Sequence, residues 1–201
     1  MPWFSCQDAL SDLRRRAFLE SLRTFASVGP TTRVLDLGGG TGAAAVRFAR
    51  GAPEIVVVDP ARAKLLHGAA HRPGIRFVEA NAEQLPFPPE RFDRIISLNS
   101  FHHFADPPAA LREVGRVLTE DGVYVQSDID PDSPAGRWFH FVENRVMGHA
   151  IEFVPLERAR SMLEGAGLSG VEAARLGRGY SLRGSKRTAR RAIEDTRPAG
   201  P

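Results

Sequence analysis

The stretch VLDLGGGTG, residues 34–42, decides the fold of this chain. Its apolar run leads into three consecutive glycines, and a segment rich in small residues, Ala43 to Arg50, has the composition of a helix. Glycine permits a positive φ angle and lets a ligand approach the backbone closely. The amides at the start of a following helix attract a carboxylate or a phosphate. The pattern therefore predicts a strand from Arg33 to Leu37, a ligand-binding turn and a helix.

The same alternation of strand and helix continues downstream. We predict strands at 55–59, 75–79, 92–98 and 123–128, with helices at 61–71 and 107–118. The pair Asp121-Gly122 predicts a turn before the fifth strand. Parallel strands need long crossover connections, which are usually helices, so this order indicates a parallel sheet covered by helices on both faces. Ligands of such sheets bind at the carboxyl ends of the strands.

The two ends of the chain differ from this core. Apolar residues at helical spacing between Leu10 and Phe25 predict a leading helix within residues 1–30, before the Gly29-Pro30 break. A helix at 156–165 and strands at 171–176 and 180–184, joined by Gly177-Arg178-Gly179, predict a closing hairpin. We expect one domain over residues 1–186, a lid-like insertion at 131–155 and a basic flexible tail at 187–201.

Composition excludes several classes of protein. The chain has 201 residues, of which 42% are hydrophobic and 25% are charged, as in globular domains rather than disordered or fibrous chains. Its single cysteine, Cys6, cannot form an internal disulfide, and we expect no metal site. No apolar run approaches the length of a membrane span, so we expect a cytoplasmic protein without a membrane partner.

Basic residues gather at the C-terminal end. From Arg175 onward there are eight arginines and lysines and two acidic residues. Aromatic residues, which would stack on bases, are not interleaved with them, so we interpret the run as a solvated tail and expect no nucleic-acid partner.

The glycine loop alone is compatible with two cofactors. Gly38, Gly40 and Ala43 satisfy the dinucleotide pattern G-x-G-x-x-A, and Asp59 lies at the right distance to hold a ribose. An NAD(P)-binding oxidoreductase is therefore one hypothesis for this chain.

A second pattern overlaps the first. The motif D-x-G-x-G-x-G at residues 36–42 resembles motif I of class I S-adenosylmethionine (SAM)-dependent methyltransferases, in particular the type 11 methyltransferase-domain family. Three further blocks resemble the same family in the same order: VVVDP at 56–60, NAEQLPFPPERFD at 81–93 and SLNSFHHFADPPAALREVGRVLTEDG at 97–122. The resemblance covers residues 33–128. It implies an α/β fold with a Rossmann-like, doubly wound seven-stranded sheet, in which five parallel strands are joined by a C-terminal hairpin with one antiparallel strand.

The resemblance also implies roles for individual residues. Gly38 and Gly40 would pack against the methionine part of SAM, with Asp36 near its ammonium group. Asp59 would accept hydrogen bonds from the ribose hydroxyls, because a carboxylate can accept two at once. Asn81 and Ala82 would contact the adenine, and Leu98 and Asn99 would line the opposite side. The complete set of implied cofactor-binding residues is Asp36, Gly38, Gly39, Gly40, Asp59, Pro60, Asn81, Ala82, Leu98 and Asn99.

Two positions depart from the family's pattern. Asn81 stands where the family often has aspartate, and Lys64 stands where it usually places an apolar residue against the adenine. These departures motivate a further hypothesis, a non-catalytic SAM-binding module, because a fold does not determine a function.

Methyl transfer from a sulfonium requires mainly alignment of the reactants. Where the acceptor must lose a proton, the candidate bases are His102 and His103, together with Asp128 and Asp130 at the end of the fifth strand. The alternative is that both histidines are structural.

We expect the leading helix and the segment from Trp138 to Phe153, within the insertion at 131–155, to cover the acceptor. Here residues at helical spacing form a stripe that serves either as core or as a substrate lid, namely Trp138, Phe141, Val142, Arg145, Val146 and His149. We expect the partner to be a small-molecule methyl acceptor, apolar or aromatic.

Overall fold

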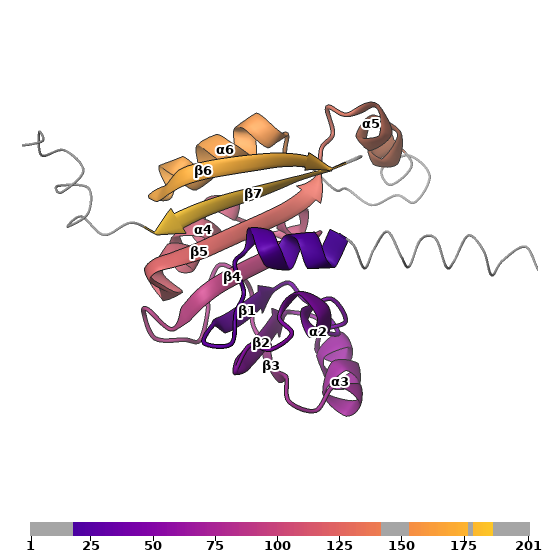
Figure 1. The fold of residues 1–201 in the computed structure, drawn as a ribbon. Coiled ribbons are helices and arrows are strands. Elements are labelled where there is room, and N and C mark those ends of the chain that lie inside the picture. Colours follow the sequence, from indigo (N-terminus) through magenta and orange to yellow (C-terminus); the bar gives the residue numbers. More distant parts are fainter. Residues whose placement is uncertain (1–17, 142–152, 177–178, 187–201) are drawn as a thin grey trace, which may run out of the picture.

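The computed structural model describes residues 18–141, 153–176 and 179–186, and these residues form a sheet with helices on both faces (Figure 1). The strands are β1 (Arg33–Leu37), β2 (Glu54–Asp59), β3 (Arg76–Glu79), β4 (Phe92–Leu98), β5 (Leu118–Ile129), β6 (Leu168–Leu176) and β7 (Gly179–Lys186). The helices are α2 (Ala45–Phe48), α3 (Arg62–His71), the 3-10 helix η1 (Phe101–His103), α4 (Pro107–Val117), α5 (Pro134–Phe141) and α6 (Leu156–Gly165). The described part of the leading helix covers residues 18–25.

The seven strands lie in the order β3-β2-β1-β4-β5-β7-β6. The first five strands of the chain are mutually parallel, whereas β7 runs antiparallel to both β5 and β6. The predicted α/β sheet, with five parallel strands and a hairpin that contributes one antiparallel strand, is confirmed. The chain moves outward from β1 through β2 and β3 and then returns to β4 on the other side of β1. Such a reversal opens a crevice at the carboxyl ends of β1 and β4.

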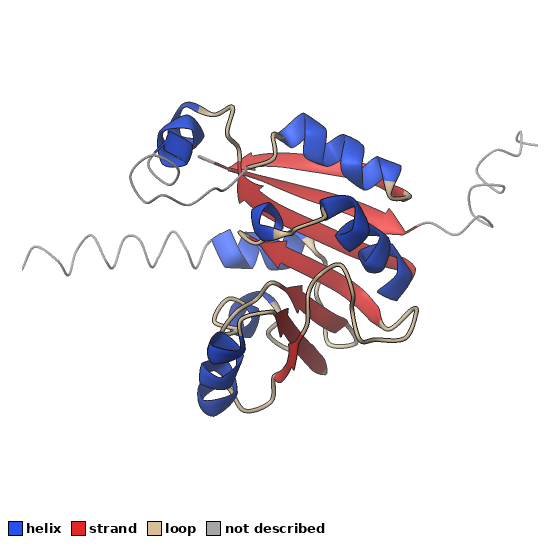
Figure 2. Ribbon diagram, turned by 180° about the vertical axis from the view of Figure 1, so that it is seen from behind, coloured by secondary structure: helices blue, strands red, loops and turns tan. Residues whose placement is uncertain are grey.

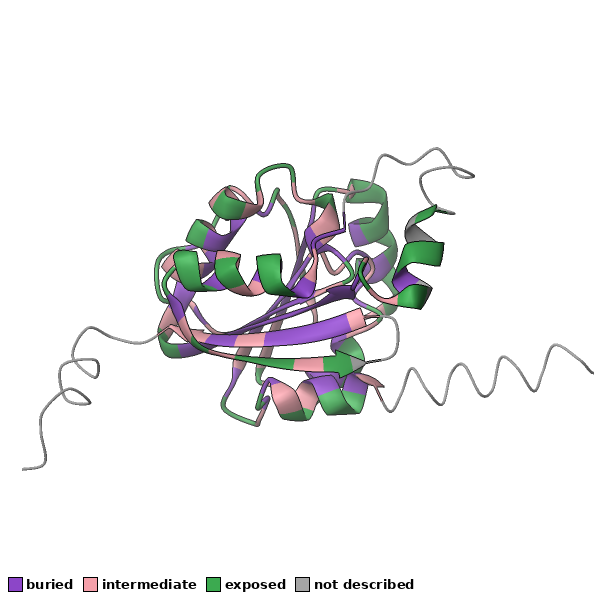
Figure 3. Ribbon diagram, turned by 90° about the horizontal axis from the view of Figure 1, so that it is seen from above, coloured by how far each residue is buried: buried purple, intermediate pink, exposed green. Residues whose placement is uncertain are grey.

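Apolar side chains alternate between the two faces of the sheet and pack against different helices. Val34 and Ile96 belong to a cluster that includes Leu22 of the leading helix and Phe48 of α2. Leu35 and its neighbours belong to a second cluster with residues of α4 and α6. Figure 2, seen from behind, shows α4 and α6 on the face opposite the leading helix. Figure 3 shows the buried strands between helices whose outer sides are exposed.

The predicted boundaries differ from the structure by more than one residue at two places in the core. The helix predicted at 43–50 is shorter, because Gly42 still belongs to the loop turn and donates its N–H to the carbonyl of Gly39 at 2.9 Å. Strand β5 begins at Leu118 and contains the predicted Asp121-Gly122 turn as a bulge, with Asp121 at φ +62°. A Cβ at Gly122 would lie 2.8 Å from the carbonyl oxygen of Thr119, so the bulge requires glycine there.

The predicted C-terminal hairpin is present, with β6 starting at Leu168 and β7 ending at Lys186. Residues 177–178 of its turn and the tail at 187–201 lie outside the described residues. Among the described residues, no helix combines the length and apolar character that crossing a membrane requires.

The insertion predicted as a lid is described only in part. Helix α5 carries Trp138 and Phe141, which are 68% and 52% exposed and stack with ring centroids 6.1 Å apart. These two side chains are therefore not part of the core. The other residues of the predicted stripe lie outside the described residues, namely Val142, Arg145, Val146 and His149.

Candidate functional site

A cavity of about 420 Å³ opens at the carboxyl ends of β1, β2 and β4. Its size lies within the range of small-molecule sites, roughly 300–1,000 Å³. Seven of the predicted site residues line it, namely Gly38, Asp59, Pro60, Asn81, Ala82, Asn99 and His103. The structure therefore brings together residues that are spread over more than sixty positions of the sequence, because parallel strands end at the same edge of the sheet.

The glycine loop lies beside this cavity and lines it through Gly38. Gly38 and Gly40 have φ angles of +75° and +57°, which only glycine adopts readily. The N–H of Gly38 donates to the carbonyl of Val58 at 2.7 Å and so ties β1 to β2 beyond the end of the sheet. A Cβ at Gly38 would lie 2.4 Å from the Cβ of Ser100, so this position has no room for a side chain.

Asp59 is held in a fixed orientation beside the loop. It is buried, and its Oδ2 accepts a hydrogen bond from the N–H of Gly40 at 2.9 Å while its Oδ1 accepts one from the N–H of Ala61 at 2.8 Å. An ionised carboxylate has about four acceptor positions, so both oxygens can accept a further bond. Because Asp59 lines the cavity, these positions suit a ligand that presents two hydroxyls.

Asp36 lies beneath the loop and has no hydrogen-bond partner. The residue is 1% exposed, and within the described part of the chain neither carboxylate oxygen is paired. Burial, and secondarily repulsion from Asp59, raise the pKa of Asp36 to about 7. A Cβ at Gly39 would lie 2.2 Å from Oδ2 of Asp36, so the carboxylate sits directly against the loop backbone. A buried acceptor without a partner is costly, which indicates that a ligand donor or cation completes the site.

Two histidines at the end of β4 have different surroundings. The Nδ1 of His102 lies 2.8 and 2.9 Å from the two carboxylate oxygens of Asp128, and the ring packs against Phe153 at 4.6 Å between centroids. This contact places the proton on Nδ1 and leaves Nε2 as the acceptor nitrogen. His103 lines the large cavity, and burial together with the adjacent His102 lowers its pKa.

His102 does not line the large cavity but a smaller one of about 230 Å³, whose walls include Phe101 and Met162. Phe104 and Ala105 belong to the walls of both cavities. The 3-10 helix η1 therefore lies next to both cavities, with His103 in the wall of the large one and His102 in the wall of the small one.

The remaining predicted residues lie near the cavity without lining it. Gly39 and Gly40 contact Asp36 and Asp59 through the loop backbone, whereas Leu98 packs against the hydrophobic core. Asp130, a candidate base, instead forms an ion pair with Arg175 and is buried at the end of β5.

Sequence reasoning did not single out Ser100, whose hydroxyl donates to the carbonyl of Leu37 at 2.8 Å and whose Cβ fills the space next to Gly38. A serine directly after Asn99 carries no pattern of its own, so no sequence signal could have found it. Lys64, by contrast, was recognised as a departure from the family's pattern, and the structure places it in the wall of the large cavity.

Residues 35–126 match a methyltransferase domain family. The chain is 38% identical over 108 residues to the uncharacterized methyltransferase YcgJ of Bacillus subtilis, which covers 51% of this chain and 43% of the relative. It is 37% identical over 128 residues to the ubiquinone/menaquinone biosynthesis C-methyltransferase UbiE of Xanthomonas oryzae, which covers 57% and 51%. The chain thus spans about half the length of these curated relatives.

Solved structures share the fold over a larger part of the chain. The crystal structure of YcgJ superposes with a TM-score of 0.71 at 23% identity and covers 85% of this chain and 98% of that chain. A SAM-dependent methyltransferase from Thermotoga maritima superposes with a TM-score of 0.74 at 21% identity and covers 90% and 94%. The matching family and the shared fold together imply SAM as the cofactor, which agrees with the presence of Asp36 and Asp59 at the glycine loop. Residues 35–126 of this chain thus match a methyltransferase-domain family, and the described residues share the fold of a solved SAM-dependent methyltransferase.

Proposed function

We propose that this chain is an enzyme that transfers the methyl group of SAM to a small apolar or aromatic acceptor. The observation that carries the proposal is the position of two aspartates at the glycine loop: Asp59 lines the cavity, and Asp36 is buried beside it with no hydrogen-bond partner among the described residues. Among the curated relatives, one is named as a methyltransferase of a hydroquinone and another as a C-methyltransferase of ubiquinone/menaquinone biosynthesis, which supports an aromatic substrate class here.

The residues present fit this cofactor. Asp59 would accept hydrogen bonds from the two ribose hydroxyls, and Asn81 with the backbone of Ala82 would hold the adenine edge. Asp36 would compensate the ammonium of the methionine part, directly or through water, so that its buried negative charge gains a partner. Lys64 lies in the cavity wall, so its ammonium must swing aside or face solvent when the adenosine part enters.

SAM, when bound, supplies a methyl group on a positively charged sulfur, and this group needs a nucleophile rather than an acid. We propose that His102 is the base that prepares the nucleophile. Asp128 would hold the imidazole with its proton on Nδ1, so that Nε2 accepts the proton of a hydroxyl, an amine or an acidic carbon of the acceptor. The histidine then carries a positive charge, which the adjacent Asp128 carboxylate stabilises.

The first test is cofactor choice followed by turnover. Isothermal titration should show saturable binding of S-adenosylhomocysteine and no binding of NADH, and a labelled methyl group should pass from SAM to at least one member of a panel of phenols, quinols and amines. Thermal protection by NADH but not by S-adenosylhomocysteine would replace the proposal with an oxidoreductase. Cofactor binding without any turnover across the panel would favour a non-catalytic SAM-binding module.

The second test concerns the histidine and its carboxylate partner. His102→Asn should lower kcat by about a hundredfold or more, which is the usual contribution of a general base, and Asp128→Asn should lower it for the same acceptor without changing KM. Affinity for S-adenosylhomocysteine should stay within about twofold, since neither residue lines the cofactor cavity.

His103→Asn is the matched control, because His103 is adjacent in sequence and lines the cofactor cavity instead. Loss of kcat in His103→Asn with full activity in His102→Asn would transfer the role of base to His103. Full activity in both variants would show that the acceptor needs no base from this pair.

A further inference from the structure

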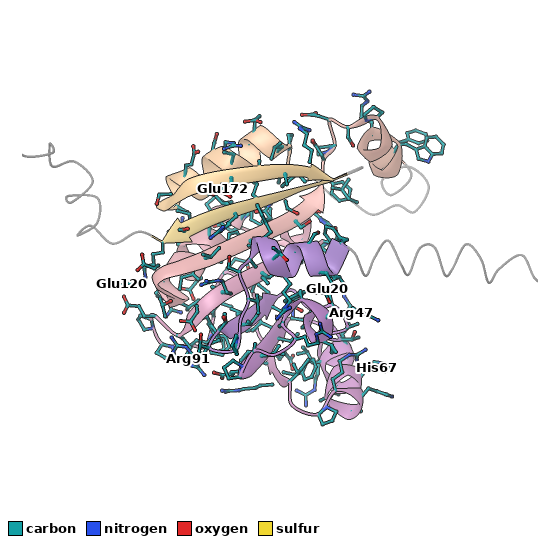
Figure 4. The ribbon with its side chains drawn as sticks, viewed as in Figure 1. Glu20, Arg47, His67, Arg91, Glu120 and Glu172 are labelled. Carbon is teal, nitrogen blue, oxygen red and sulfur yellow. The ribbon has the colours of Figure 1, made fainter. Side chains whose placement is uncertain are left out.

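A second cavity lies away from the cofactor site, between the leading helix, α2 and the end of α3. It measures about 380 Å³. Its walls are formed by Glu20, Ala43, Val46, Arg47, Arg50 and Arg72. Figure 4 labels Glu20 on the leading helix and Arg47 on α2, two elements that both line this cavity. The proposed methyl transfer makes no use of this cavity.

Its charge is strongly positive. Three guanidinium groups face one carboxylate, and the contact between Arg50 and Glu20 is long, at 3.9 Å, with both side chains largely exposed. Exposed pairs of this kind contribute little energy, so Glu20 does not neutralise the cavity. Within the described residues, Arg47 and Arg72 take part in no ion pair.

Arg72 contributes a side-chain donor that has no acceptor among the described residues. Its Nη1 is buried and has no hydrogen-bond acceptor within the described part of the chain. A buried guanidinium donor without a partner carries a large desolvation penalty. Arg72 directly follows α3, and its N–H donates to the carbonyl of Gly68 at 2.9 Å, which fixes the backbone at the cavity wall.

We propose that this cavity binds a small phosphorylated ligand that carries a pyrophosphate group. Guanidinium groups match phosphate oxygens with two parallel hydrogen bonds, and three of them from two elements can surround two linked phosphates. The described walls contain no aromatic side chain on which a base could stack, so a nucleic-acid strand is the poorer fit.

The position of the cavity places its ligand behind the glycine loop. Ala43 follows Gly42 directly, and Arg47 and Arg50 lie on α2 and just beyond its end. The ligand would therefore contact the segment that directly follows the glycine loop, and it would not enter the cofactor cavity.

The test is isothermal titration of the full chain with inorganic pyrophosphate at about 0.15 M salt, where weak surface attraction is screened. One saturable site is expected. Arg47→Gln and Arg72→Gln should each weaken binding by about tenfold or more, and Arg72→Lys should recover only part of it, because lysine lacks the planar fork. Arg112→Gln, on the opposite face in α4, is the matched control and should change affinity less than twofold.

Unchanged affinity for S-adenosylhomocysteine, measured without pyrophosphate, shows that the variants are folded. The proposal is overturned by the absence of saturable binding, or by an equal loss in Arg112→Gln, which would mean general charge attraction. Tighter binding of a single-stranded RNA oligomer through the same arginines would replace the small ligand by nucleic acid. None of these outcomes depends on methyl-transfer activity, so the two proposals fail separately.

Discussion

Asp59→Ala should weaken the binding of S-adenosylhomocysteine by about a hundredfold or more, since hydrogen bonds to a charged group contribute about 1.5–3 kcal/mol each and two would be lost. The carboxylate is buried, and two backbone amides already hold both of its oxygens in place. This preorganisation means that little ordering is needed on binding, so the full effect should appear in the affinity. Isothermal titration measures it directly.

Asp106→Ala is the matched control for this carboxylate. Asp106 caps α4 by accepting a hydrogen bond from the N–H of Ala109 at 2.9 Å, and it does not line the cavity. Its loss should lower stability by about 1 kcal/mol without changing the affinity. Equal affinity of Asp59→Ala and the unaltered chain, with both proteins folded by circular dichroism, would contradict the assignment of Asp59 to the ribose.

Asp36→Asn should stabilise the ligand-free protein at pH 8 while weakening cofactor binding. Since the folded pKa of Asp36 is about 7, against an ordinary value of 3.8, the ionised carboxylate opposes folding above pH 7. This difference corresponds to about 4 kcal/mol as an upper bound. The amide has nearly the same shape but no charge, so it avoids this penalty and also loses the attraction to the ammonium of SAM.

The sign of the pH dependence follows from linkage. A raised folded pKa means that the folded state binds the proton more tightly, so the contribution of Asp36 to stability is complete below about pH 4 and is lost as the pH rises through 7. Urea unfolding of the unaltered chain and of Asp36→Asn at pH 5 and pH 8 isolates the contribution of Asp36 to the free energy of unfolding, because all other groups are the same in the two proteins. A stability difference that is the same at the two pH values would refute it.

The carboxylate of Asp36 lowers the stability of the ligand-free protein and favours the binding of a cationic ligand. An unpaired buried carboxylate lowers the stability of the empty protein, and a cationic ligand restores it. Asp36 and Asp59 also repel each other across the loop, which raises the pKa of Asp36 further. Ligand binding should therefore stabilise this protein more at pH 8 than at pH 5.

Local pattern was enough to predict most elements and part of the site. Strand β1 and strand β4 have the bounds expected from their apolar runs, and α6 begins and ends where its helical spacing predicts. The positive φ angles of Gly38 and Gly40 follow from residue type, since glycine alone tolerates them without strain. The bulge in β5 was missed because Asp121-Gly122 has the composition of a turn in either setting.

What the sequence by itself determined is therefore the order of strands and helices, the glycine loop, and the placement of Asp59 at a strand end, because these depend on neighbours within a few residues. Only the tertiary structure decided that Asp36 is buried with no partner among the described residues, that His102 meets Asp128 from a strand 26 residues away, and that three arginines line one cavity. Burial and pairing are properties of segments distant in the chain, and the energies that assign them arise only once the sheet has brought those segments together.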